Sequence, residues 1–413
     1  MGLVKNLWRK LTHTKALEQS SGKLETVFFE SIYRVAYLTG LSTSDRDVSY
    51  LLYSNAVKLM IVLLVCGEVW YGFTETSSLD EVAASINATV IQFITIYRYK
   101  NMMEHKDFYK KLATSMESPF FDISTQERKK LVDFWSRTNE KYFKLLLALG
   151  NCTLAAWFIF PLVDEVDYNL IVGIRLPFYY KTPVLYPLAY IMVVIAFTYI
   201  SHFVMVTDLI MQTHLMHLLC QFTVLADCFE NLLSDCKVGF EGILFGNTPA
   251  FLYNKSFADK YTKRLGDLVQ QHKLILSHTM NMRNTLSGPM LGQLAASGTL
   301  ICFVGYQATT TIAESIAKCL MSFLFLGYNV FELYIICRWC EEITNRSQQI
   351  GEAIYASGWE CGVSKLPGVK STILFVIARA NKPLFLTAGG MYNLSLTSYT
   401  TLNIYCTIVL RLV

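Results

Sequence analysis

Long apolar runs separated by charged stretches dominate the pattern of this chain. Four runs contain no Asp, Glu, Lys or Arg: residues 145–163, 182–207, 284–313 and 383–410. A fifth run, 319–337, is interrupted only by Glu332. Because a helix of about 20 mostly apolar residues crosses a bilayer, we expect a membrane-spanning helix in each of the five.

Two further runs are weaker candidates for spans. Residues 51–73 carry Lys58 and Glu68, and residues 82–97 are polar for a span. Ionisable groups inside a span are candidates for function. For Lys58 and Glu68 we favour positions near the membrane interfaces, reached by their flexible side chains, over ion coordination. With both runs included, the chain has seven spans.

The basic residues test this count, because Lys and Arg are enriched in cytosolic loops. Alternate connections hold 28 of the 36 basic residues on one side and only three on the other. Dropping either weak span would place basic loops on both sides. The distribution therefore predicts seven spans with a cytosolic N-terminus and an extracellular C-terminus.

Helical apolar spacing continues beyond two of the spans. It runs through residues 209–233 after the fourth span and through 338–356 after the sixth, which indicates helical extensions that pack as a cytosolic bundle. We therefore predict an all-α integral membrane protein. It divides into a cytosolic segment (1–46), spans one to four (47–207), a cytosolic extension (208–283), spans five and six (284–337), cytosolic anchor helices (338–382) and a last span (383–413).

Composition agrees with a membrane protein and offers little chemistry. Hydrophobic residues make up 53% of the chain, charged residues 16%, the mean hydropathy is +0.35 and the net charge is +4. This balance argues against a nucleic-acid partner. There is no P-loop and no G-x-S-x-G motif, and His214 and His217 have no evident third metal ligand. We therefore expect no enzyme activity, no cofactor and no metal site.

Aromatic side chains gather in the outer halves of several spans. Trp157 lies in the third span, Tyr186 and Tyr190 in the fourth, and Phe323 in the sixth. They can serve as interfacial belts and helix-packing residues. Together they can also line an apolar pocket for a small, uncharged, lipid-soluble molecule.

The chain resembles the insect odorant receptors over essentially its whole length. The resemblance rests on the inverted seven-span order, the extended fourth to sixth helices and the ending Tyr405-Cys-Thr-Ile-Val-Leu-Arg411, which is similar to an aromatic-x-x-x-x-Leu-Arg pattern. Gustatory receptors end differently, and Ile404, Arg411 and Leu412 depart from their pattern. The connection at 207–287 is too short for the insertion of the shared co-receptor. The resemblance is therefore to a ligand-tuned subunit.

The resemblance implies an odorant-gated, non-selective cation channel of four subunits. It implies co-receptor subunits as partners, a small volatile apolar ligand, contact with membrane lipid and a plasma-membrane location in the dendrite of an olfactory neuron. The inverted orientation argues against coupling to a G protein. A gustatory-type channel and, less favoured, a small-solute transporter stay open.

Two groups of residues are expected to carry this function. The ligand pocket is expected at Thr89, Phe93, Trp157, Tyr186, Tyr190, Ser322 and Phe323. The pore face of the last span follows from 100° per residue, and the resemblance places the hydrophobic gate at Ile408 and Leu412 on that same face. The predicted pore stripe is Thr397, Thr401, Ile404, Ile408 and Leu412, with Gly390 in line, although a packing face is the competing interpretation.

Overall fold

A computed structural model describes residues 10–74, 79–163, 168–238, 240, 254–311 and 316–412. It describes the backbone alone for the helical residues 79–84, 87, 163, 303, 305–311, 316–319 and 405–412. The helices are α2 (Lys15–Glu18), α3 (Lys23–Leu38), α4 (Val48–Thr74), α5 (Leu79–Glu104), α6 (Lys106–Ala113), α7 (Gln126–Val163), α8 (Leu185–Glu230), α9 (Leu232–Lys237), α10 (Lys255–Thr311), α11 (Ile316–Tyr355), α12 (Val369–Ala380) and α13 (Leu396–Leu412). Short 3-10 turns lie at Ser115–Glu117, Trp359–Cys361 and Val363–Lys365. Two strands, β1 (Thr387–Ala388) and β2 (Tyr392–Asn393), form an antiparallel pair.

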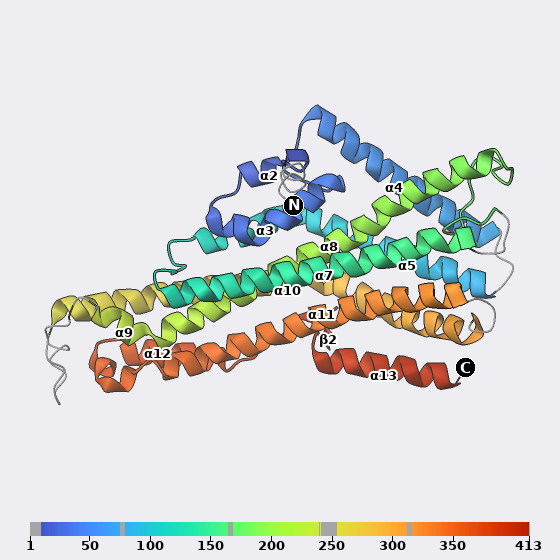
Figure 1. Cartoon of the computed structure of the whole chain (residues 1–413). Helices are drawn as coiled ribbons and strands as arrows, with labels where there is room; N and C mark the ends of the chain where they lie inside the picture. Colours follow the sequence, from blue (N-terminus) through green and yellow to red (C-terminus); the bar gives the residue numbers. More distant parts are fainter. Residues whose placement is uncertain are drawn as a thin grey trace.

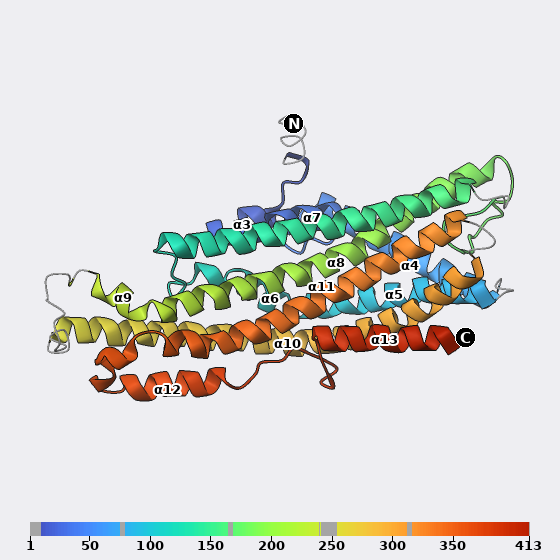
Figure 2. The ribbon, with the colours of Figure 1, turned by 60° about the horizontal axis from the view of Figure 1, so that its bottom comes forward.

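Four long helices, α7, α8, α10 and α11, run along the length of the molecule (Figure 1). The helices α4, α5 and α13 join them in one half, while α9 and α12 lie at the opposite end (Figures 1 and 2). Four helices, α4, α7, α8 and α11, are long and apolar enough to cross a membrane within the described residues. The all-α fold expected from the apolar runs is therefore confirmed.

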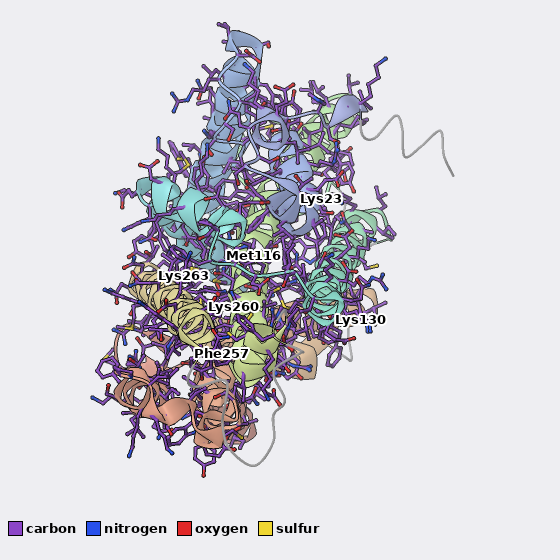
Figure 3. The ribbon with its side chains drawn as sticks, turned by 90° about the vertical axis from the view of Figure 1, so that its left-hand side faces the viewer. Lys23, Met116, Lys130, Phe257, Lys260 and Lys263 are labelled. Atoms are coloured by element: carbon purple, nitrogen blue, oxygen red, sulfur yellow. The ribbon has the colours of Figure 1, made fainter. Side chains whose placement is uncertain are left out.

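The part of α8 that follows Met205 lies at the centre of the bundle, in the end that contains α9 and α12. Its side chains from Leu215 to Leu219 are completely buried. Seen from this end (Figure 3), α8 lies between α10, which carries Lys260 and Lys263, and α7, which carries Lys130. Apolar residues on all sides of a helix indicate a helix enclosed by others. This extension of the fourth span is therefore the core of the helical extensions.

A cluster of charges holds four of these extensions together. Arg128 of α7, with a side chain 1% exposed, pairs with Asp122 at 2.6 Å, Asp227 of α8 at 2.8 Å and Asp235 of α9 at 2.5 Å. Arg264 of α10 pairs with Asp122 as well. Burial lowers the pKa of the Arg128 guanidinium, but Cys228 and the carboxylates of Asp235 and Asp227 outweigh it and raise that pKa above its ordinary value. Because a buried charge requires a partner, each acid fixes one element against α7.

The last apolar run is not helical throughout, which corrects our expectation for its first part. Residues 383–395 contain the strands β1 and β2, and the helix α13 begins only at Leu396. Gly389 and Gly390 form the turn between the strands with φ of +60° and +71°, values that glycine adopts without strain. Gly390 therefore does not lie on the helical stripe. The carboxylate of Glu341 in α11 accepts a 2.6 Å hydrogen bond from the Leu396 amide and so caps α13.

Candidate ligand-binding site

A cavity of about 90 Å³ lies between α5, α7, α8 and α11. Each of these four helices contributes three to five residues to its wall, and they come from segments far apart in the sequence. The lining residues are Ala88, Ile91, Gln92, Gly150, Thr153, Leu154, Trp157, Phe197, Ile200, Ser201, Val204, Met205, Phe325, Tyr328 and Asn329. The cavity therefore exists only once the four helices have packed together.

Aromatic rings form one wall of the cavity. The indole of Trp157 stacks on Phe197, with ring centroids 5.2 Å apart and planes 19° apart. The ring of Phe325 meets the same indole edge-on at 5.6 Å and 64°. Such pairs hold the rings in fixed orientations. The wall therefore presents a rigid apolar surface to any molecule inside the cavity.

Two polar side chains of the wall are engaged by their own helices, whereas Oε1 of Gln92 and the indole nitrogen of Trp157 are buried without a hydrogen-bond partner among the described residues. Thr153 donates a 3.0 Å hydrogen bond to the carbonyl of Leu149, and Asn329 donates a 2.8 Å hydrogen bond to the carbonyl of Phe325. The wall is therefore mainly apolar, and burial of such area contributes about 25 cal/mol per Å², while two of its polar atoms are available to a bound molecule.

Tight packing of α7 against α8 shapes the floor of the cavity. A methyl group added at Gly150 of α7 would come 2.6 Å from the sulfur of Met205 in α8. Small residues allow such close approach between membrane helices. Gly150 is the single glycine of the apolar run 145–163, and it is the signal in the sequence that marks this contact.

The seven predicted pocket residues do not lie together at this cavity. Trp157 lines the cavity. Phe93 and Phe323 do not line it, and they are 54% and 52% exposed on the outside of this single chain. The hydroxyls of Tyr186 and Tyr190 donate to the carbonyls of Asn169, at 2.6 Å, and Phe158, at 2.5 Å.

The remaining two residues of the predicted pocket also lie outside the cavity wall. Thr89 bonds back to the carbonyl of Ser85 on its own helix, and Ser322 is buried. Their immediate sequence neighbourhood is nevertheless that of the cavity, because Ala88 and Phe325 line it. The four predicted helices thus meet at the cavity, while the predicted side chains largely differ from those that line it.

Most lining residues lie outside the set predicted from the sequence, among them Ala88, Ile91 and Gln92 of α5. Gln92 is buried at 4% exposure, and Glu68 of α4 lies beside it with 2% exposure. Glu68 is therefore enclosed by the bundle, which corrects the interfacial position that we favoured for it. Lys58 lies over the ring of Tyr99, 5.8 Å from its centroid. A polar pair across two helices is visible only in the folded bundle.

A buried group of charges lies one helical turn beyond the cavity. Glu332 follows Asn329 on α11, and Asp208 follows Met205 on α8. Both acids meet Arg98 of α5, and Gln293 of α10 donates a 3.2 Å hydrogen bond to Glu332. The same four residues thus link α10 to three of the helices that form the cavity.

The last helix, α13, has one packed face and one free face in this single chain. Leu402 packs near Gly298 of α10, and Tyr399 meets the ring of Tyr334 in α11 at 5.6 Å. Thr397, Thr401 and Ile404 lie on the free face, where Ile404 is 59% exposed. The side chains of Ile408 and Leu412, also predicted for the pore, lie outside the described residues.

Comparison with known proteins places the chain in a family. A family model described as 7tm Odorant receptor matches residues 78–405. In Drosophila melanogaster, Odorant receptor 22b is 26% identical over 147 residues, covering 35% of each chain. Odorant receptor 67a is 32% identical over 135 residues, covering 32% of each. Odorant receptor 13a is 22% identical over 275 residues, covering 63% of this chain and 62% of that receptor. The matches to the first two span about a third of those relatives.

The fold has a solved counterpart. The insect olfactory receptor OR5 from Machilis hrabei superposes with a TM-score of 0.76 at 15% identity, covering 93% of this chain and 97% of that receptor. Its complex with eugenol superposes equally well, at 14% identity, with coverage of 94% and 99%. That receptor shares the all-α, multi-helix membrane architecture described above. Because the family model covers most of its length, this chain belongs to the odorant receptor family.

Proposed function

We propose that this chain is the ligand-tuned subunit of an odorant-gated, non-selective cation channel. The observation that carries the proposal is the aromatic-walled cavity enclosed by α5, α7, α8 and α11. A small volatile binds there and biases the helices toward an open arrangement, since a ligand shifts an equilibrium by its differential affinity for the two states. The eugenol complex of the Machilis receptor supports a ligand of this size and chemistry.

The pore is formed by the free face of α13 in a ring of four subunits. Its exposed Thr397 and Thr401 keep part of the pore wet, and Ile404, Ile408 and Leu412 form aliphatic constrictions that stop ions by dewetting. The opposite face of α13 is already occupied by α10 and α11. This division of the helix supports the pore assignment over a packing role for the stripe.

The partners of this subunit are odorant co-receptor subunits in a heterotetramer. Apolar side chains at the far end of the molecule support such contacts: Tyr355, Leu374 and Phe375 are 67%, 47% and 71% exposed. Exposed apolar groups of this kind mark interaction surfaces. The assembly lies in the plasma membrane as a multi-pass protein, with its N-terminus in the cytosol and its C-terminus outside.

The experiment that tests the function is a whole-cell current recording. The chain is expressed with the co-receptor in cells that lack G-protein signalling, and a panel of volatiles is applied. We expect an inward cation current that depends on both subunits and on a subset of volatiles. Saturable uptake of a solute without current would favour a transporter, and responses to tastants alone would favour a gustatory-type channel.

A further inference from the structure

A second and larger cavity, of about 440 Å³, lies away from the first and shares no lining residue with it. Its walls come from α2 and α3, the connection between α3 and α4, the end of α5, α6 and α8. Both α3 and α6 pack against α8 (Figure 2). A volume of this size lies within the range of about 300–1,000 Å³ that small-molecule sites occupy.

The wall of this second cavity has two chemically different parts. The inner part is buried and mainly apolar, with Phe29 and Ile32 of α3, Leu41 and Met102 among its members. Three buried polar residues, Glu25, Tyr109 and His214, also line it. The outer part carries three cations, Arg46, Lys106 and Lys110, whose side chains are exposed. A mainly apolar interior beneath exposed cations matches a molecule with an apolar body and an anionic head.

The three basic side chains are available to bind an anionic headgroup. Among the residues that the structure describes, Arg46, Lys106 and Lys110 form no ion pair and no side-chain hydrogen bond. Other basic residues nearby do form ion pairs: Arg34 pairs with Glu30 at 2.9 Å, and Lys15 pairs with Asp47 at 2.6 Å.

The two acidic residues of the wall, Glu25 and Asp107, are each stabilised by groups of their own segment. Glu25 accepts hydrogen bonds from the amide and hydroxyl of Ser21 and from the hydroxyl of Tyr33. Asp107 lies in the first turn of α6, where the helix dipole favours a negative charge. Neither acid forms an ion pair with the three cations, which leaves their charge available to an anion.

The position of the cavity along the bundle indicates the source of that anion. Arg46 lies two residues before α4 begins, and Met102 and Lys106 follow Arg98 at the end of the apolar part of α5. The exposed cations therefore lie where two of the spans leave their apolar segments. Basic groups at this level attract the headgroups of anionic lipids.

We propose that this second cavity binds one anionic phospholipid. The phosphate of its headgroup contacts Arg46, Lys106 and Lys110, and an acyl chain lies against Phe29, Ile32, Leu41 and Met102. The ligand would hold the N-terminal helices α2 and α3 against α6 and α8. The proposal concerns a site apart from the first cavity and does not depend on which odorant binds there.

The test uses the full-length protein in a neutral detergent after its lipids have been removed. Dioctanoyl phosphatidylinositol is titrated while thermal stability is followed, with dioctanoyl phosphatidylcholine and glycerophosphoinositol as separate arms. We expect the anionic lipid to raise the melting temperature and the other two to have little effect. Equal stabilisation by glycerophosphoinositol would overturn the acyl part of the proposal, and equal stabilisation by phosphatidylcholine would overturn the role of the cations.

Two matched sets of substitutions distinguish specific binding in the cavity from non-specific electrostatic attraction of the lipid to the protein. Arg46→Gln, Lys106→Gln and Lys110→Gln together should weaken the lipid by about one hundredfold, because each basic group near a lipid surface contributes about a factor of five. Lys100→Gln, Lys111→Gln and Lys130→Gln remove the same charge from exposed positions outside the cavity wall. They should change the affinity by less than about twofold. An equal loss in both sets would refute a specific site.

A covalent readout serves as a second measurement that does not depend on the stability of the variants. An anionic lipid with a photoactivatable acyl chain is bound to the unsubstituted protein, irradiated and mapped by mass spectrometry. We expect labels on the α3 peptide that contains Phe29 and Ile32. Labels confined to the outward-facing residues of α4 would place the lipid on the surface of the bundle and overturn the proposal.

Discussion

Arg98 of α5 and Asp208 of α8 form an ion pair that is almost completely removed from solvent, with side chains 1% and 2% exposed. Glu332 of α11 lies 4.0 Å from the same guanidinium, and the amide oxygen of Gln293 in α10 accepts a hydrogen bond from it. The guanidinium of Arg98 therefore interacts with two carboxylates and connects α5 to α8, α10 and α11. This group lies one turn from the first cavity on α8 and α11, which makes it a physical link between that cavity and α10.

Removal of Arg98 should destabilise the protein strongly. In Arg98→Met, Asp208 and Glu332 remain buried without their cation, and breaking a buried pair in this way costs about 3–5 kcal/mol. We expect a lower melting temperature in detergent and a lower yield. The double variant Arg98→Met with Asp208→Leu should recover much of the loss, because it removes one unpaired acid. A single variant as stable as the unsubstituted protein would show that water reaches this cluster.

Substitution of Trp157 should weaken the response to ligand more than substitution of an outward-facing aromatic. Trp157→Ala removes the ring that stacks on Phe197 and should raise the half-maximal concentration about tenfold, since roughly 60 Å² of contact area is lost at 25 cal/mol per Å². Phe323→Ala is the matched control, because this ring is 52% exposed and does not line the cavity. Dose–response curves of current measure both. A larger effect at Phe323 would favour the pocket expected from the sequence.

The two faces of α13 should differ in their access to thiol reagents. Ile404→Cys lies on the free face and should be modified from the outside with loss of current, whereas Leu402→Cys packs near α10 and should be protected. Ile408→Ser should raise the current without ligand, because a polar side chain lowers the cost of wetting a narrow pore. The subunit ratio is held constant in all recordings. Protection of Ile404→Cys together with modification of Leu402→Cys would mean that the helix is rotated in the assembly.

Acid should destabilise the helical extension of α8 through its buried histidines. Burial lowers the pKa of His214 to about 4, against about 6.5 in an unfolded chain. The stability associated with the neutral ring is therefore complete above pH 6.5 and is lost as the pH falls toward 4, by up to about 1.4 kcal/mol per pH unit. His214→Phe keeps the ring contacts with Phe29 and Tyr109, 4.9 Å away in each case, and removes the titration.

Melting temperatures between pH 7.5 and 4.5 measure this effect. We expect a shallower decline for His214→Phe than for the unsubstituted protein, while His105→Phe, at an exposed position, should leave the decline unchanged. Parallel declines for all three proteins would assign the acid sensitivity to other groups, among them His217, His272 and His278, whose pKa values burial also lowers.

The distribution of basic residues predicts the orientation of the protein in the membrane. An epitope placed after Val413 should be stained by antibody on intact cells, and an epitope at the N-terminus should be stained only after permeabilisation. Both tags are compared on the same protein, which controls for damaged cells. The reverse pattern would contradict the cytosolic N-terminus and, with it, the proposed direction of the pore.

The helices themselves were determined by the sequence alone. Runs of apolar residues must satisfy their backbone hydrogen bonds internally in lipid, and a helix does so within one segment. The extensions beyond the fourth and sixth runs were also predictable, because helical apolar spacing continues through residues 209–233 and 338–356 without Pro or paired Gly. The first part of the last run was wrongly predicted to be helical, because Gly389 and Gly390 form a turn and the helix begins at Leu396.

The tertiary structure decided which face of each helix forms the cavity. In a membrane helix, residues that face lipid and residues that face other helices are both apolar, so hydropathy does not reveal the rotation of the helix. Trp157 and Phe323 look alike in the sequence, yet one lines the cavity and the other faces outward. The contact between Arg98 and Asp208, 110 positions apart, likewise arises only when α5 and α8 pack together. Glu332 of α11 and Gln293 of α10 meet the same guanidinium, so the surroundings of the pair depend on residues from two further helices that are remote in the sequence.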